Sequence, residues 1–310
     1  MTTPSITTAG PSGGTGLPVA PNLRRRPRPG ETVIRTILML SALISVLITV
    51  GILVALVRPV LDFFAEIPFG EFFATEGTYA VVPLVTGTLM VTAIALLVSV
   101  PLGLGAAMYL SEYASRRARK VLKPTVELLA GIPSVVYGFF ALSFVTPTLL
   151  QDILGMEIGF TNALAAGLVL GVMVIPTIAT LSEDAMSAVP QALRQGSLAM
   201  GANRMQTTIR VVFPAALSGI SAAVVLGMSR AIGETMIVAL AAGGQKNLSA
   251  DPREGMQAMT GFIAQTAGGE NPVGSTEYNS LFAVGLLLFT MTLVLNVISI
   301  SFVRRFRQEY

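Results

Sequence analysis

The chain has 310 residues, of which 53% are apolar and only 12% are charged, and its mean hydropathy is +0.72. Because about a quarter of the residues of a soluble protein are charged, this composition indicates a protein that folds in lipid. The chain has no Cys and no His, which excludes disulfides, thiolate metal sites and catalysis by a histidine base. The net charge of +3 gives no indication of nucleic-acid binding.

The N-terminal segment 1–30 is rich in Pro, Gly, Thr and Ser and has few large apolar residues. This composition is typical of disorder, so we expect a disordered cytosolic tail. The next segment, 31–78, holds the first apolar run and a loop that we expect on the outer side. That run is too long for a signal peptide and lacks an A-x-A-like end, which predicts a membrane anchor that stays in the protein.

Six stretches of the chain are long enough to cross a membrane, since a transmembrane helix needs about 20 mainly apolar residues. Five of them carry no charge, and the fifth in chain order is interrupted only by Arg230 and Glu234. The sequence therefore predicts an all-α membrane protein with about six transmembrane helices. In chain order the stretches are 36–57, 77–111, 128–151, 158–182, 211–245 and 278–303.

The basic residues predict the orientation of these helices. Sixteen of the 20 Lys and Arg residues lie before the first stretch, after the sixth, or in the two links that follow the second and the fourth. Cytoplasmic segments of membrane proteins carry an excess of Lys and Arg, so both termini are expected in the cytoplasm.

The link between the fourth and fifth stretches, 183–213, is long, and its residues favour helices over an extended loop. Gly201 suits the position after a helix C-terminus, and Asn203 can cap a second short helix. Pro214 lacks a backbone donor and is expected to begin the fifth span. Two interpretations remain open: a helix that lies on the lipid surface, or a docking element for a cytosolic partner.

This link resembles the motif E-A-A-x3-G-x9-I-x-L-P of binding-protein-dependent ABC transporter permeases. Gly201 and Pro214 stand at the family's spacing, while the E-A-A triplet is replaced by Gln195, Gly196 and Ser197. The resemblance implies an ABC importer permease fold over 79–310, in which 183–213 is the loop that couples the permease to its ATPase.

Four further segments narrow the resemblance to phosphate (Pst-type) importers and to their C-type permease subunit. It implies a multi-pass subunit of the bacterial inner membrane, in contact with lipid, that works with an A-type permease, an ATPase dimer and an external phosphate-binding protein. The chain has no G-x-x-x-x-G-K-[ST] loop, so ATP and Mg²⁺ are expected on the partner ATPase and not on this chain. The segments are 109–114 (YLSEYA), 131–138 (GIPSVVYG), 182–185 (SEDA) and 230–236 (RAIGETM).

Four residues are candidates for the substrate path. Arg230 and Glu234 are ionisable groups in an apolar stretch, and their spacing of four allows them to pair on one helix face. Arg230 offers a forked set of donors to an oxyanion, but a structural ion pair is the alternative. Ser134 and Tyr137 are expected at mid-span beside Pro133, where a plain helix kink is equally compatible.

Two other functions remain open at this point. Permeases for sulfate or molybdate share the loop motif, and a stand-alone secondary carrier would also need six spans. Uptake that survives loss of an ATPase would favour the carrier. The residues Gly167 and Gly171 are spaced as a pair of small residues at a helix–helix contact.

Overall fold

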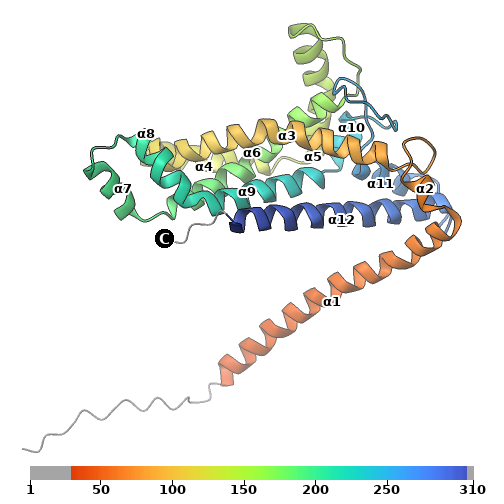
Figure 1. Ribbon diagram of the computed structural model, residues 1–310, viewed down its shortest axis with the longest axis horizontal. Coiled ribbons are helices and arrows are strands. Elements are labelled where there is room, and N and C mark those ends of the chain that lie inside the picture. The colour runs from red at the N-terminus through yellow and green to blue at the C-terminus, as the bar shows by residue number, and fades with distance from the viewer. Residues whose placement is uncertain (1–28, 306–310) are drawn as a thin grey trace, which may run out of the picture. The chain divides into compact units, whose positions relative to one another are not determined.

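The structure, a computed structural model, describes residues 29–305, and within this range the regular structure consists of helices, without strands (Figure 1). Six of these helices are long and apolar enough to cross a membrane, which confirms the predicted all-α class and the number of spans. The tail predicted over 1–30 lies outside the described residues as far as residue 28. The chain divides into two units, Met1–Leu53 and Val54–Tyr310.

The first unit contributes the beginning of α1 (Pro29–Glu66) to the described residues. Every side chain from residue 31 to residue 52 is exposed, although the stretch is strongly apolar. An apolar helix surface of this length suits the hydrocarbon core of a bilayer.

The second unit is built around α6 (Ala163–Ser187), which is the most buried span: 61% of the residues in its apolar window lie inside. It packs against α3 (Val82–Met108) and α9 (Phe213–Ile232). The expected role of Gly167 and Gly171 is confirmed, because a Cβ atom at these positions would lie 2.6 Å from Ile94 Cβ and 2.9 Å from Val98 Cβ. Glycine is needed at both places for this close approach.

The order of these contacts gives the helix directions. Along α3 and α6 the contacts advance together, from Ile94 with Gly167 to Val98 with Gly171, so the two helices are parallel. Along α9 the order is reversed, since Gly219 meets Ala185 and Gly227 meets Ile178. Hence α3 and α6 end, and α9 begins, at one end of the bundle, which we call the basic end because most of the described Arg and Lys side chains gather there.

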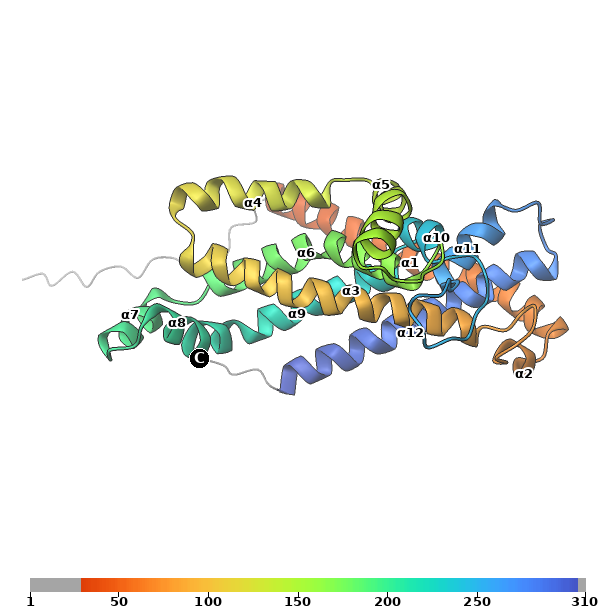
Figure 2. The ribbon, with the colours of Figure 1, turned by 90° about the horizontal axis from the view of Figure 1, so that it is seen from above.

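Figure 2 shows α7 and α8 at the basic end and α2, α10 and α11 towards the other. The helix α4 begins at the basic end, after the π-helical segment η1, and runs back alongside α6. The remaining elements are α2 (Phe69–Phe72), η1 (Tyr109–Tyr113), α4 (Arg116–Ala130), α5 (Ser134–Phe140), η2 (Ala141–Ile153), α7 (Gln191–Ala199), α8 (Arg204–Thr207), η3 (Thr208–Val212), α10 (Met236–Ala241), α11 (Met259–Gly268) and α12 (Thr276–Arg305).

Two of the predicted spans are not continuous helices. In the stretch 128–151 the helix α4 ends at Ala130, and α5 begins at Ser134 with Pro133 as its N-cap. A proline disfavours the helical conformation of the residue before it and has no N–H to donate, which explains this break. In the stretch 211–245 the helix α9 ends at Ile232, and α10 begins at Met236.

Candidate functional site

The turn between α7 and α8 has the geometry that the sequence predicts. Gly201 follows the C-cap of α7 with φ +87, a region that L side chains rarely adopt. Its N–H donates to the Leu198 carbonyl at 3.0 Å, and the Ala202 N–H donates to the Ser197 carbonyl at 3.2 Å, which together form a Schellman motif. No atom lies within 4 Å of a Cβ built at Gly201, so backbone conformation and not space requires the glycine.

The cap predicted at Asn203 is also confirmed. Asn203 Oδ1 accepts from the Gln206 N–H at 2.9 Å, and Gln206 Oε1 accepts from the Asn203 N–H at 3.0 Å, which completes a capping box. Pro214 occupies the second position of α9, close to where it was expected. It does not mark the start of the fifth span, because α8 and the π-helical η3 continue into α9 and the helical run extends from Arg204 to Ile232.

The triplet that replaces E-A-A lies on α7. Gln195 and Gly196 are exposed, and Ser197 Oγ lies 2.9 Å from Thr207 Oγ1, which joins α7 to α8. Apolar side chains are exposed close by, with Met200 at 89% and Met205 at 63% of their full accessible surface. Exposed apolar residues at the tip of a folded loop suit a protein partner.

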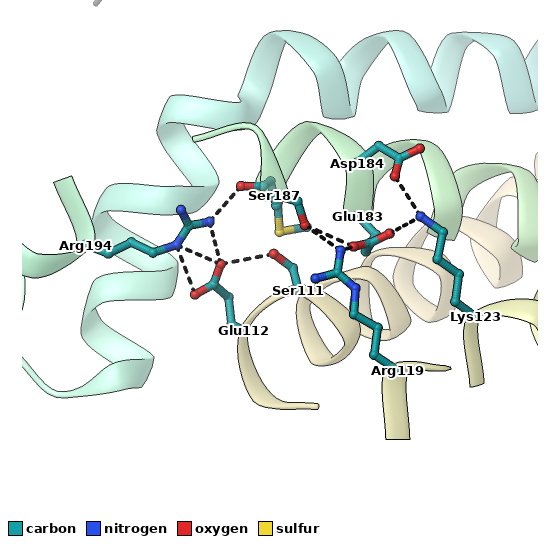
Figure 3. Close-up of polar contacts among 9 residues, drawn as sticks. Ser111, Glu112, Arg119, Lys123, Glu183, Asp184, Ser187 and Arg194 are labelled. Carbon is teal, nitrogen blue, oxygen red and sulfur yellow. Dashed lines mark hydrogen bonds and ion pairs between the residues drawn. The ribbon is translucent and has the colours of Figure 1, made fainter. Parts of the chain in front are cut away.

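An arginine connects this loop to the bundle (Figure 3). Arg194 of α7 forms an ion pair of 2.9 Å with Glu112 of η1, and both side chains are close to nine-tenths buried. The same guanidinium donates to the Met186 carbonyl at 2.7 Å and to the Val189 carbonyl. These carbonyls belong to the C-terminus of α6 and the residues after it, where helix carbonyls lack intrahelical partners. Arg194 therefore fixes α7 to the ends of two spans.

A second group of charges joins α4 to α6 (Figure 3). Its centre is Glu183, whose side chain is fully buried and forms ion pairs with Arg119 and with Lys123, the latter at 2.6 Å. Ser187 Oγ donates to Glu183 Oε1 at 2.9 Å, and Lys123 also reaches Asp184 at 2.8 Å. A buried carboxylate needs such partners, because desolvation of an isolated charge is costly.

These ion pairs are not predictable from the sequence pattern. The basic residues indicate only the orientation of the spans, and Glu112 and Glu183 belong to the segments 109–114 and 182–185 that resemble the family. The one available signal was the position of Glu183 directly after an uncharged stretch of 25 residues, 158–182.

The break after α9 changes the interpretation of Arg230 and Glu234. Arg230 lies in the last turn of α9 with an exposed side chain, and Glu234 lies beyond the C-cap Gly233. Glu234 Oε1 accepts from the N–H groups of Met236 and Ile237, at 3.1 and 3.4 Å, and so caps α10. Within residues 29–305 no ion pair joins Arg230 to Glu234, so the expected i, i+4 pair on one continuous helix is wrong. Each charge instead lies at a helix end whose dipole favours it.

Ser134 and Tyr137 lie at the start of α5, and not in the middle of a continuous helix as predicted. The Tyr137 hydroxyl donates at 2.9 Å to the Leu129 carbonyl in the last turn of α4, which also accepts from the Ile132 N–H at 3.4 Å. Ser134 is half-buried at the first position of α5. A Cβ at Gly138, in the second half of α5, would lie 3.3 Å from the Met236 carbonyl and 3.3 Å from Leu240 Cβ, so α5 packs closely against α10.

Six apolar spans among the described residues, and a folded loop that an ion pair fixes to the bundle, define a multi-pass membrane component. Residues 99–309 match the family model described as binding-protein-dependent transport system inner membrane component. The chain therefore belongs to this family, and it is a transport component of the bacterial inner membrane, not an enzyme.

Two curated relatives are similar over most of the chain. One is the probable ABC transporter permease protein YqgH of Bacillus subtilis (strain 168), 40% identical over 70% of each chain. The other is the phosphate transport system permease protein PstC 1 of Mycobacterium tuberculosis (strain ATCC 25618 / H37Rv), 36% identical over 76% of this chain and 78% of the relative.

A solved structure supports the fold. The bacterial alginate ABC transporter, in complex with an alginate pentasaccharide-bound periplasmic protein, matches with a TM-score of 0.64 and 17% identity, over 89% of this chain and 96% of that chain. At this identity the likeness shows the fold alone. ABC permeases work with other permease subunits, ATPases and binding proteins, and this holds for the family to which the chain belongs.

Proposed function

We propose that the chain is the C-type permease subunit of an ATP-driven importer of inorganic phosphate. The observation that carries this proposal is the 36% identity with a phosphate transport permease over three-quarters of the chain. The segments 131–138 and 230–236, which carry the resemblance to this subunit, are also the segments in which the structure places the two helix breaks. Membership of an importer family argues against a stand-alone secondary carrier.

The basic end is proposed to face the cytoplasm and to bind an ATPase dimer. The loop 183–213 presents exposed apolar residues there, and Arg194 connects it to η1 and α6, so a displacement of α7 would reach the spans. ATP and Mg²⁺ belong to the ATPase, and a second, A-type permease completes the path. Gln195 and Gly196 are exposed on α7, which suits contact with the ATPase.

The opposite end is proposed to receive the external phosphate-binding protein. It has a cavity of about 720 Å³ between the loops that follow η2 and α10. Glu157, Glu254 and Asp251 line it, and hydrogen bonds from Arg253 lower the pKa of Asp251 to about 2, so its carboxylate stays charged. Lys246 helps to fix the second loop, since its Nζ donates to the Thr78 carbonyl and lies 4.9 Å from the centre of the Phe262 ring.

The substrate path is proposed to pass the two helix breaks. The Arg230 guanidinium is exposed in a chain that otherwise pairs its buried charges, and within the described residues it has no hydrogen bond or ion pair. Its donor fork can hold a phosphate oxyanion. Glu234 holds α10 in place, and Ser134 can add a hydroxyl donor. Tyr137 is a positioning residue, because its hydroxyl already binds Leu129.

Competition for uptake tests the proposed substrate. Cells or proteoliposomes with the assembled transporter take up radiolabelled phosphate, and unlabelled phosphate, sulfate and molybdate are added in excess. Of the three unlabelled anions, only phosphate should suppress uptake of the radiolabel. Suppression by sulfate or molybdate at the same concentration would favour the alternative, a permease for another oxyanion. Uptake that continues without the ATPase would contradict an ATP-driven importer altogether.

A further inference from the structure

The helix α4 carries five basic residues in its first half, yet none of its side chains is buried. Arg119 and Lys123 point to Glu183 of α6 and are paired. Arg116, Arg117 and Lys120 are exposed and, among the residues that the structure describes, have no hydrogen bond or ion pair. Three cations on one helix face are therefore without an anionic partner.

The exposed face of α4 changes from basic to apolar along its length. Arg117, Val121 and Leu128 share this face, since they are four and eleven residues apart. Val121 is 66% exposed and Leu128 74% exposed. Eleven residues rise about 16 Å along a helix, close to half the thickness of a ~30 Å hydrocarbon core. The basic part lies at the end of the bundle and the apolar part towards its middle. One bilayer leaflet changes in the same order, from charged headgroups to apolar acyl chains.

A cavity of about 450 Å³ lies against the basic part, lined by Arg116, Arg119, Lys120, Lys123, Pro124 and Glu127. It is far larger than the ~30 Å³ that one water occupies, so it has room for a headgroup. Arg119 and Lys123 are paired with Glu183, so Arg116 and Lys120 face the single carboxylate of Glu127, and the lining keeps an excess of positive charge.

We infer that α4 binds an anionic phospholipid, with the headgroup phosphate at Arg116, Arg117 and Lys120 and the acyl chains along Val121 and Leu128. Basic clusters next to a membrane span attract anionic lipid at the cytoplasmic surface. Free phosphate would neutralise the cations but would leave the apolar residues uncovered. A soluble ATPase would reach the end of the bundle but not Leu128, three turns deeper. The inference does not depend on which substrate is transported.

The test uses the purified assembled transporter in nanodiscs of equal parts phosphatidylglycerol and phosphatidylcholine. Native mass spectrometry counts the phosphatidylglycerol molecules that remain bound. The wild type should retain phosphatidylglycerol in preference to phosphatidylcholine. In the variant with Arg116→Gln, Arg117→Gln and Lys120→Gln the affinity should fall about a hundredfold, since each basic residue near the surface contributes about fivefold to lipid affinity.

Two controls separate lipid binding from folding and from general charge. The variant Arg116→Lys with Arg117→Lys keeps the charges and should retain the lipid. The variant Arg204→Gln with Arg210→Gln removes exposed cations from the same end but outside α4, and it should also retain the lipid. If the glutamine variant does not assemble, Arg117→Gln alone should still reduce retention.

Four results would overturn the inference. They are a wild type that retains no more phosphatidylglycerol than phosphatidylcholine, a glutamine variant that retains as much as the wild type, release of the lipid by millimolar inorganic phosphate, and loss of the ATPase or the second permease from the glutamine variant with lipid retention unchanged. The third result would make the cluster a phosphate site, and the fourth would make α4 a protein interface.

Discussion

The buried ion pairs at the basic end contrast with the two charges at the helix break after α9. At the basic end Arg194, Arg119 and Lys123 each bind a carboxylate of another element, and Glu183 is fully buried. At the break, Arg230 and Glu234 lie four residues apart and do not bind each other. Ion pairs join η1, α4, α6 and α7 at the basic end. At the break, Arg230 lies in the last turn of α9 without an ion pair.

This difference separates two tasks. Buried ion pairs give a defined arrangement of elements, which suits a region that must pass on a displacement without deforming. An exposed arginine at a break has donors free for a ligand, and the two helix ends can move without breaking an ion pair. This difference supports the proposal that the basic end serves coupling and that the break contacts the substrate.

The proposed roles of the two regions require the basic end to face the cytoplasm. The first prediction therefore concerns the orientation of the chain in the membrane. The chain has no Cys, so single cysteines give clean labelling. Met200→Cys, 89% exposed at the basic end, should resist an impermeant thiol reagent in intact cells, while Val273→Cys, 85% exposed near the other end, should react. Labelling of Met200→Cys from outside would reverse the proposed orientation.

If the loop 183–213 couples the spans to the ATPase, Gly201→Val should lose nearly all uptake. Valine strongly disfavours φ +87, so the turn between α7 and α8 would have to change. We expect normal membrane insertion, with ATP hydrolysis that no longer drives uptake or with loss of the ATPase, measured by uptake and ATPase assays on the purified complex.

Gly201→Asn is the matched variant, since asparagine tolerates positive φ better than other non-glycine residues. It should keep most of the uptake. Gln195→Ala, on the same helix but exposed, should have a smaller effect than Gly201→Val. Normal uptake by Gly201→Val would count against the docking role of this loop.

The buried ion pairs of Glu183 predict that Glu183→Ala lowers the stability of the protein, with a smaller effect than that of Gly201→Val. The change leaves Arg119 and Lys123 without their buried partner, but both are partly exposed, at 39% and 28%, so the expected loss of stability is about 1–3 kcal/mol. Thermal unfolding of the purified complex measures it. Asp184→Asn is the control, because Asp184 is 61% exposed and its pair should contribute less than about 1 kcal/mol. Equal shifts for both variants would show that burial of Glu183 does not matter.

The fold was predictable where it depends on composition and local chemistry. Five uncharged runs and one run interrupted by two charges predicted the six spans, and the conformational preferences of Gly201 and Asn203 predicted the turn and the cap of the loop. The break at Gly233 was not predictable, because an apolar run carries no information on helix continuity and the Glu234 side chain can either pair along a helix or cap a new one.

The ion pairs of the basic end could not be predicted from the sequence for a different reason. Arg194 and Glu112 are 82 residues apart, and Arg119 and Glu183 are 64 apart. Such pairs form only because α3 and α6 are parallel and end together, and that packing depends on the glycine contacts between them. A single sequence shows the charges but not which of them meet.

The most direct test of the account is phosphate transported per ATP hydrolysed, measured in proteoliposomes with the full transporter carrying Arg230→Gln or Arg230→Lys. Gln removes the charge and Lys removes the fork, so transport should fall roughly 10- to 100-fold in both, as expected for loss of a charged hydrogen bond, while insertion and assembly stay normal. The double change Arg230→Leu with Glu234→Leu should also lose transport. If that double variant transports phosphate at the wild-type ratio, both charges are structural and the path lies elsewhere.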